Sequence, residues 1–186
     1  IPEKIAKDLL SWSKSFIPDD VLYLEQPDDT KHGRAQRMHV TLKYGLHSLR
    51  PSDRLLRILH EEPPIMVRFM KSASFNTDPQ YDVVMIEVES DDLIRLNQTI
   101  SDHCESTQTQ SAYRPHVTLA YVKKGLAHQF EGNARFLGTE FMANKIIFSS
   151  PDGKEFPIHL REVNKQLFPS GHQRGRRITL PEVLNQ

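Results

Sequence analysis

The sequence predicts an α+β fold made of two similarly ordered halves. Stretches with helical apolar periodicity alternate with runs of β-branched and aromatic residues that are typical of strands. Each half has a helix, then a strand, then a β-hairpin, and each of these strands contains the tetrapeptide His-Val-Thr-Leu, at residues 39–42 and 116–119. We therefore expect an internal duplication in which the two His strands are symmetric partners.

In the first half, a helix over residues 2–16 is followed by short strands at 21–24 and 38–44. Between the strands lies a polar loop, residues 25–36, which is either a lid over a cleft or an exposed connection. The helix is indicated by an apolar stripe at steps of three and four residues, in which Trp12 is expected to anchor the core: Ile5, Leu9, Trp12 and Phe16.

The remaining elements follow from helix caps, apolar periodicity and turn residues. Ser52 and Ser90 are the expected N-caps of two further helices. In order, we predict a helix from residue 52 that stops at Pro63, a hairpin of 65–75 with 81–88, a helix from residue 90 to about 104, the second His strand at 116–122, and a final hairpin of 142–149 with 155–160.

The composition is that of a soluble globular protein, with 186 residues, 38% hydrophobic and 26% charged. Basic and acidic residues are equal at 24 each, so no global field attracts a long nucleic acid and anion recognition must be local. Apolar runs are too short to span a membrane. The single cysteine, Cys104, excludes an internal disulfide. We expect a cytoplasmic or other intracellular protein, and a virus- or phage-encoded origin stays open.

We expect one domain over residues 1–160 and a basic C-terminal tail or linker over 161–186. The tail holds five Lys or Arg residues against two Glu. This composition favours a flexible basic linker. It could lead to a further domain or a protein partner, or bind nucleic acid weakly.

The two tetrapeptides carry the candidate chemistry. Because side chains alternate along a strand, each His shares a face with its Thr, while Val and Leu point to the core. Two histidines can divide the roles of general base and general acid, since a pKa near 6.5 lets one be neutral and the other protonated. The hydroxyls of Thr41 and Thr118 can stabilise charge on the phosphate oxygens. We therefore predict His39, Thr41, His116 and Thr118 as catalytic residues.

Other polar side chains near the motifs are candidate substrate contacts. The same alternation adds Arg37, Lys43 and Arg114 to the polar faces, although each could equally be a solvated charge at a strand end. Tyr113 precedes the second motif and is a possible base-stacking group. Two further tyrosines follow the motifs, Tyr44 and Tyr121. Alternation places both behind the face that carries His and Thr, where we expect them to pack in the core.

No metal or other cofactor is expected in this scheme. The sequence has no His-Glu-x-x-His stretch, and His39 and His116 lack carboxylates at ligand spacing. It also has no Gly-x-x-x-x-Gly-Lys-Ser/Thr loop that would cradle the phosphates of ATP.

The paired His-x-Thr-Leu motifs resemble those of the 2H phosphoesterase superfamily, which includes RNA 2′,5′-ligase-like proteins and cyclic phosphodiesterases. The resemblance covers roughly residues 1–160. It implies a two-lobed α+β fold, with pseudo-twofold duplicated antiparallel sheets flanking a central cleft and helices on the outside. It also implies that His39 and His116 are acid and base, and that Thr41 and Thr118 contact the phosphate.

Three functions follow as hypotheses from this resemblance. The first is metal-independent hydrolysis of a 2′,3′-cyclic phosphate, or of a related 2′,5′ or cyclic-oligonucleotide linkage at an RNA end, with His116 as base and His39 as acid. The second is degradation of a nucleotide second messenger, a cyclic dinucleotide or a 2′,5′-oligoadenylate. The third is a non-catalytic module that binds RNA ends or nucleotides. The matched His pair favours an enzyme.

Overall fold

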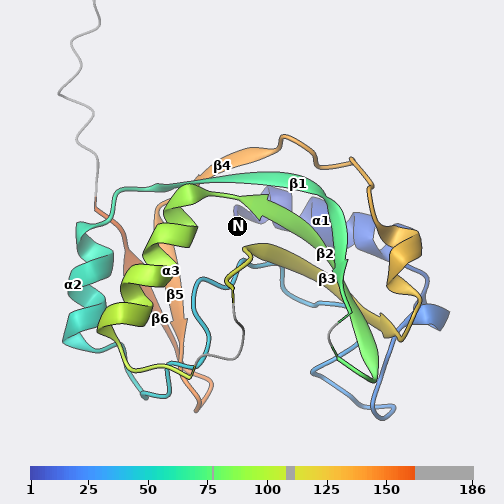
Figure 1. The fold of residues 1–186 in the computed structure, drawn as a ribbon, viewed down its shortest axis with the longest axis horizontal. Coiled ribbons are helices and arrows are strands. Elements are labelled where there is room, and N and C mark those ends of the chain that lie inside the picture. The colour runs from blue at the N-terminus through green and yellow to red at the C-terminus, as the bar shows by residue number, and fades with distance from the viewer. Residues whose placement is uncertain (77, 108–111, 162–186) are drawn as a thin grey trace, which may run out of the picture.

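A computed structural model of the chain describes residues 1–76, 78–107 and 112–161 and confirms the predicted α+β class (Figure 1). The helices and strands are, in order, α1 (Glu3–Phe16), η1 (Asp19–Val21), α2 (Asp53–Glu61), β1 (Ile65–Phe75), β2 (Tyr81–Glu89), α3 (Asp91–His103), β3 (His116–Lys123), η2 (Ala127–Phe130), β4 (Glu140–Ala143), β5 (Lys145–Ser149) and β6 (Glu155–His159).

Two antiparallel sheets of unequal size form the framework. In the described residues, the larger sheet has four strands in the order β3-β2-β1-β4, and β5 pairs with β6 in the smaller one. Figure 1 shows β1, β2 and β3 arching across the middle of the molecule, with α2, α3, β5 and β6 at one end. The turn between β1 and β2 and the short helix η2 lie at the other end.

Helix caps and buried stripes explain why the predicted helices form. The side chains of Ser52 and Ser90 accept hydrogen bonds from the backbone N–H groups of Leu55 and Leu93, at 3.2 and 3.3 Å, as the sequence predicts for N-caps. Helix α1 packs on β3, and its fully buried Leu9 belongs to the same core as β3. None of the helices in the described ranges is both long and apolar enough to cross a membrane.

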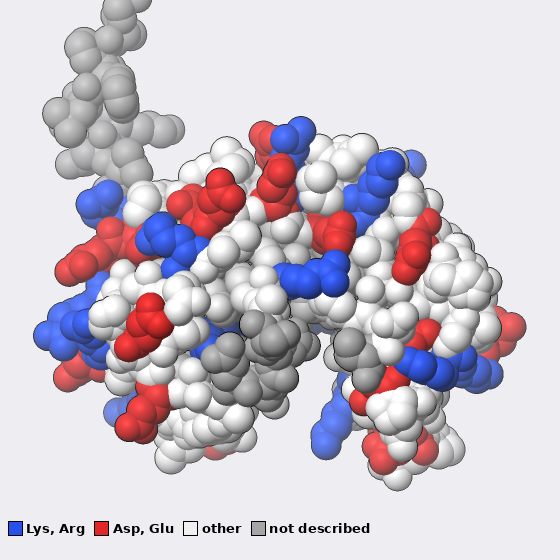
Figure 2. All heavy atoms as spheres, viewed as in Figure 1, with Lys and Arg blue, Asp and Glu red and all other residues white. Residues whose placement is uncertain are grey.

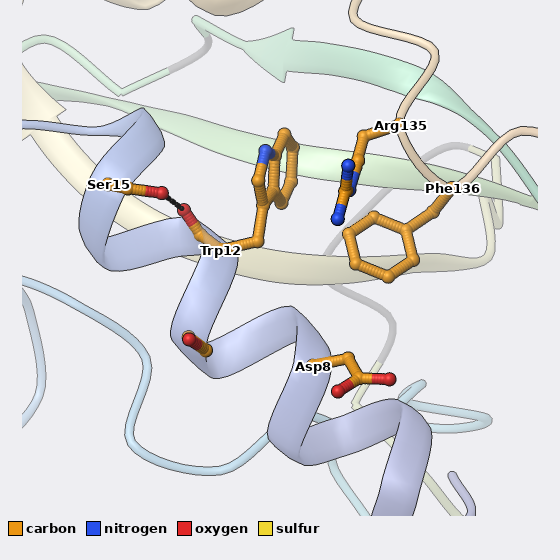
Figure 3. A pocket seen from close by; sticks show the side chains of 6 residues that line it. Asp8, Trp12, Ser15, Arg135 and Phe136 are labelled. Carbon is orange, nitrogen blue, oxygen red and sulfur yellow. Dashed lines mark hydrogen bonds between the residues drawn. The ribbon is translucent and has the colours of Figure 1, made fainter.

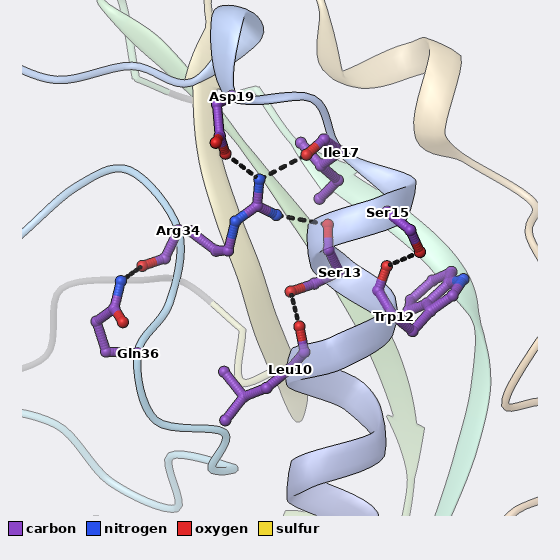
Figure 4. A network of polar contacts seen from close by, with 8 residues as sticks. All are labelled: Leu10, Trp12, Ser13, Ser15, Ile17, Asp19, Arg34 and Gln36. Carbon is purple, nitrogen blue, oxygen red and sulfur yellow. Dashed lines mark hydrogen bonds and ion pairs between the residues drawn. The ribbon is translucent and has the colours of Figure 1, made fainter.

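Arg34 fixes the C-terminal end of α1 (Figure 4). Its guanidinium donates to the carbonyl oxygens of Ser13 and Ile17, the latter at 2.6 Å, and to the carboxylate of Asp19 at 2.7 Å. The Ser13 carbonyl also accepts from the backbone N–H of Ile17 at 3.0 Å. The Ile17 carbonyl lies just past the helix, where no intrahelical donor is available, so Arg34 satisfies it. The backbone of Arg34 also bridges Ala120 of β3. The loop over residues 25–36 is therefore tied down at this end.

Three predicted strands differ in the structure. The segment 21–24 becomes η1 followed by a single bridge between Leu22 and Val122. The predicted strand 142–149 is divided at Asn144, because β4 pairs with β1 whereas β5 pairs with β6. The first His segment, 38–44, is not a regular strand. The other predicted helices and strands are confirmed within a few residues.

The first His segment is irregular because its register with β3 shifts. Arg34 bridges Ala120 and Val40 bridges Val117. The stretch from Arg34 to Val40 is longer than the stretch of β3 that it faces, and the extra residues interrupt the ladder. The predicted tail lies outside the described residues apart from Arg161, whose backbone N–H donates to Glu62 at 2.7 Å.

Candidate active site

The two His-Val-Thr-Leu segments lie side by side and run antiparallel. Val40 bridges Val117 of β3. Val117 is fully buried and Val40 packs against the same core. The valines therefore point to the core, as the alternation predicts, and the two His segments are direct neighbours, as the duplication predicts.

The register places the polar side chains of the motifs together on the other face of this pair. Since the valines are opposite each other, His39 lies opposite Thr118, and Thr41 lies opposite His116. Residues opposite each other have Cβ atoms about 4.5–5.5 Å apart, and diagonal neighbours are about 7–8 Å apart. The two imidazoles are thus diagonal, and each stands beside the threonine of the other segment.

Both imidazoles are held in the same way by their own backbone. Nδ1 of His39 lies 3.0 Å from the carbonyl oxygen of Arg37, and Nδ1 of His116 lies 2.8 Å from that of Arg114. A carbonyl oxygen can only accept, so Nδ1 carries a proton in both rings and Nε2 is the nitrogen left available for other contacts. The repeated unit is therefore longer than the tetrapeptide. It begins at the arginine, as Arg-x-His-Val-Thr-Leu.

The surroundings of the two histidines differ. His39 is exposed, whereas His116 is half-buried and meets the ring of Phe75 edge to face, at 4.9 Å between ring centroids and an interplanar angle of 85°. Burial lowers the pKa of His116, and the charges of His39 and Arg114 lower it further, against the bond with the Arg114 carbonyl. His116 is therefore biased toward the neutral imidazole that a general base needs.

The three cations predicted as phosphate contacts each have a protein partner. The guanidinium of Arg37 pairs with Glu155, and that of Arg114 with Glu87 at 2.8 Å.

Lys43 is held by α3, where its Nζ donates to the hydroxyl of Ser101 at 2.7 Å. Arg37 and Arg114 flank the histidines and stay exposed, so they remain the better placed of the three to meet an anion.

Tyr113 connects the two motifs. Its hydroxyl donates to the backbone carbonyl oxygen of Thr41 at 2.9 Å, and burial raises its pKa. The amide of Asn97 on α3 donates to the next carbonyl, that of Leu42, at 2.6 Å. Sequence reasoning proposed Tyr113 as a substrate contact and did not find Asn97, which carries no motif and lies on a helix face that only the fold brings here.

Tyr121 lies on the face that carries the motif His and Thr residues, contrary to the alternation prediction. The register between β2 and β3 shifts at this point, and the consecutive residues Leu119 and Ala120 are both fully buried. Such a bulge reverses the alternation of side chains, so Tyr121 returns to the face that carries Thr118. The prediction for Tyr44 is also wrong, because its side chain is 69% exposed.

The loop over residues 25–36 contains a candidate metal group, which is Glu25, Asp29 and His32 among the described residues. The Asp29 carboxylate already accepts from the backbone N–H of Glu25 at 2.9 Å and of Lys31 at 2.7 Å, and lies 2.6 Å from Nδ1 of His32. These contacts, the Glu25 N–H first, hold the pKa of Asp29 well below its usual range. Asp29 and His32 are therefore already bonded to other residues of the loop.

The ring of His32 packs among tyrosines and fixes this loop to the sheet. Its centroid lies 5.3 Å from that of Tyr23, 5.0 Å from that of Tyr81 on β2 and 5.3 Å from that of Tyr121 on β3. Because Arg34 anchors the other end of the loop, we interpret residues 25–36 as a fixed connection beside the catalytic face.

Two cavities lie away from the motif residues. One, of about 500 Å³, runs along α1, where Figure 3 shows Trp12, Arg135 and Phe136 facing one another. Trp12 also stacks on Phe16, at 4.3 Å between ring centroids, which agrees with its predicted role as a packing anchor. The other, of about 690 Å³, lies at the C-terminal end of α3 beside Cys104.

Charge on the molecular surface is mixed. In the described part of the face drawn in Figure 2, acidic and basic side chains alternate, and the outline is notched below the middle. A face with mixed charge of this kind does not attract a long polyanion.

Comparison with known proteins points to one family. The family model described as the 2′-5′ RNA ligase superfamily matches residues 22–155, which include both motifs. Among solved structures, the protein TT0787 of Thermus thermophilus is similar, with 18% sequence identity, a TM-score of 0.49, and coverage of 85% of this chain and 93% of that chain. No curated protein matches the chain.

Proposed function

Because the chain belongs to the 2′-5′ RNA ligase superfamily, we propose that it is a metal-independent phosphodiesterase that hydrolyses a 2′,3′-cyclic phosphate or a related 2′,5′ or cyclic-oligonucleotide linkage. The observation that carries this proposal is the diagonal pair His39 and His116, each beside a threonine and each with Nδ1 bonded to a carbonyl. Such a pair can act on opposite sides of one phosphate.

In the proposed reaction, Nε2 of His116 takes a proton from the attacking water. The water oxygen bonds to phosphorus as the ester bond to the ribose oxygen breaks, and Nε2–H of His39 protonates that departing oxygen. His116 ends protonated and His39 neutral, and proton exchange with solvent restores both. The lowered pKa of His116 supports its role as the base.

The threonines stabilise the charge that develops on phosphorus. Thr41 and Thr118 lie on the same face as the imidazoles, and each hydroxyl can donate to a non-bridging oxygen. Because one threonine stands on each strand, the two hydroxyls reach the phosphate from different sides. Arg37 and Arg114 add positive charge at the edge of this group.

A substrate panel tests the activity. The protein is incubated in EDTA with 2′,3′-cyclic nucleotides, 2′,5′-oligoadenylates and cyclic dinucleotides, and products are identified by mass. We expect turnover of at least one class, and a loss of at least about 100-fold in kcat in both His39→Ala and His116→Ala.

His60→Ala serves as a matched control, because His60 is exposed on α2, outside the motifs, and should keep full activity. No product from any class, or wild-type rates in either motif variant, contradicts the proposal. Binding of panel members without turnover identifies a binding module instead.

A further inference from the structure

The two motifs are identical in sequence, yet the reaction proposed above needs one histidine neutral and the other protonated. Something outside the motifs must therefore make them different. We propose that Phe75 is the positioning residue that makes His116 the base and leaves His39 the acid. This inference rests on the proposed function, and it concerns which neighbours assign the two roles.

The contact that carries the proposal crosses the sheet. Phe75 is the last residue of β1, and β2 lies between β1 and the His116 strand β3. The Phe75 ring nevertheless meets the His116 ring at 4.9 Å, with an interplanar angle of 85°. An apolar ring in this position takes the place of water against the imidazole, and loss of hydration disfavours the charged form.

In the described residues, no aromatic ring takes the equivalent place beside His39 of the first motif. His39 is exposed, and among the described residues its ring forms no aromatic pair. Its Nδ1 is bonded to its own backbone, through the carbonyl of Arg37. His39 is therefore open to solvent, whereas the Phe75 ring lies against His116.

Charged groups near His116 contribute less to its lowered pKa than burial does. Arg114 lies on the same segment, with its guanidinium 5.0 Å from the Phe75 ring centroid. Glu87 of β2 is the direct cross-strand partner of His116 and pairs with Arg114 at 2.8 Å. The charges of His39 and Arg114 lower the pKa of His116, but burial is the largest cause of the shift. The Phe75 ring contributes to that burial.

The test is a titration of individual histidines by NMR, which needs no turnover. In Phe75→Ala, we expect the pKa of His116 to rise toward about 6.5 while that of His39 stays unchanged. Phe75→Leu keeps apolar cover and should show a smaller rise. The comparison is repeated with Arg114→Gln in the background, where Phe75→Ala should still raise the pKa of His116.

An unchanged pKa of His116 in Phe75→Ala, an equal rise in both histidines, or an equal rise in the Ala and Leu variants overturns the proposal. Circular dichroism checks that the variants fold. Phe75→Thr, which suits a strand end, replaces the Ala variant if that one unfolds.

Activity provides the second measurement. The acidic midpoint of kcat/KM should move to higher pH in Phe75→Ala by the same amount as the titration of His116, and a midpoint that stays in place contradicts the proposal. If no substrate is turned over, the proposed function fails, while the titration still decides whether Phe75 distinguishes the two histidines.

Discussion

The hydroxyl of Tyr113 donates a hydrogen bond to the backbone carbonyl oxygen of Thr41, with 2.9 Å between the oxygens. This bond compensates for a weakness of the first motif, which in the described structure is joined to β3 by a single bridge at Val40. Beyond that bridge, side chains hold its carbonyls, Tyr113 at Thr41 and Asn97 at Leu42. Tyr113 therefore positions the threonine that faces His116.

Removing that hydroxyl should affect catalysis through Thr41. A hydrogen bond of this kind contributes about 0.5–1.5 kcal/mol, so Tyr113→Phe should lower kcat by about 2- to 10-fold, with little change in KM. In a Thr41→Val background the same change should have no further effect, whereas in Thr118→Val it should keep its full effect. Equal effects in the two backgrounds, measured by steady-state kinetics, contradict the coupling.

The hydroxyls of Thr41 and Thr118 should each contribute measurably to catalysis. Hydrogen bonds to charged groups contribute about 1.5–3 kcal/mol, so Thr41→Val and Thr118→Val should each lower kcat/KM by about 10- to 150-fold. The Ser variants at both positions keep the hydroxyl and should retain most of the activity. A Val variant as active as its Ser counterpart shows that the hydroxyl does not meet the phosphate.

The pH dependence of kcat/KM should be bell-shaped. The base must be neutral, so activity is lost as the pH falls through the pKa of His116 in the folded protein. Since burial lowers this pKa, the acidic midpoint should lie below about 6.5. The alkaline limb reports deprotonation of the acid. Rates measured with the best substrate of the panel between pH 4 and 9 check this, and an acidic midpoint above 6.5 excludes His116 as the base.

Arg34 should stabilise the fold without taking part in the chemistry. Its side chain is only 8% exposed, and Arg34→Met leaves the Ile17 carbonyl without its donor, whereas the Ser13 carbonyl keeps the backbone N–H of Ile17. An unsatisfied buried acceptor costs about 1–3 kcal/mol, so the free energy of unfolding in urea should fall by about 1–3 kcal/mol.

The matched control for this measurement is Arg68→Met, because Arg68 makes only exposed ion pairs, with Glu89 at 3.6 Å and Glu140 at 3.4 Å. This variant should lose no more than about 1 kcal/mol. Equal losses in the two arginine variants mean that the helix-end contacts of Arg34 contribute nothing specific.

The helices, the hairpins and the two motifs could be read from the sequence because local chemistry specifies them. Ser52 and Ser90 cap helices through bonds to residues three positions away, and the apolar stripe of α1 depends on helical periodicity. Alternation also places His39 and Thr41 on one face, away from Val40. Each of these features depends on neighbours in the chain, so the sequence by itself determined the class of fold and the set of catalytic candidates.

The tertiary structure decided which residues surround those candidates. A bulge in β3 moves Tyr121 to the face that carries Thr118, and an irregular register leaves the first motif dependent on Tyr113. The curved sheet brings Phe75 to His116 but leaves His39 exposed. Registers and bulges are set by packing between strands distant in sequence, which a periodic pattern does not encode. Two identical motifs therefore acquire different environments only when the chain folds.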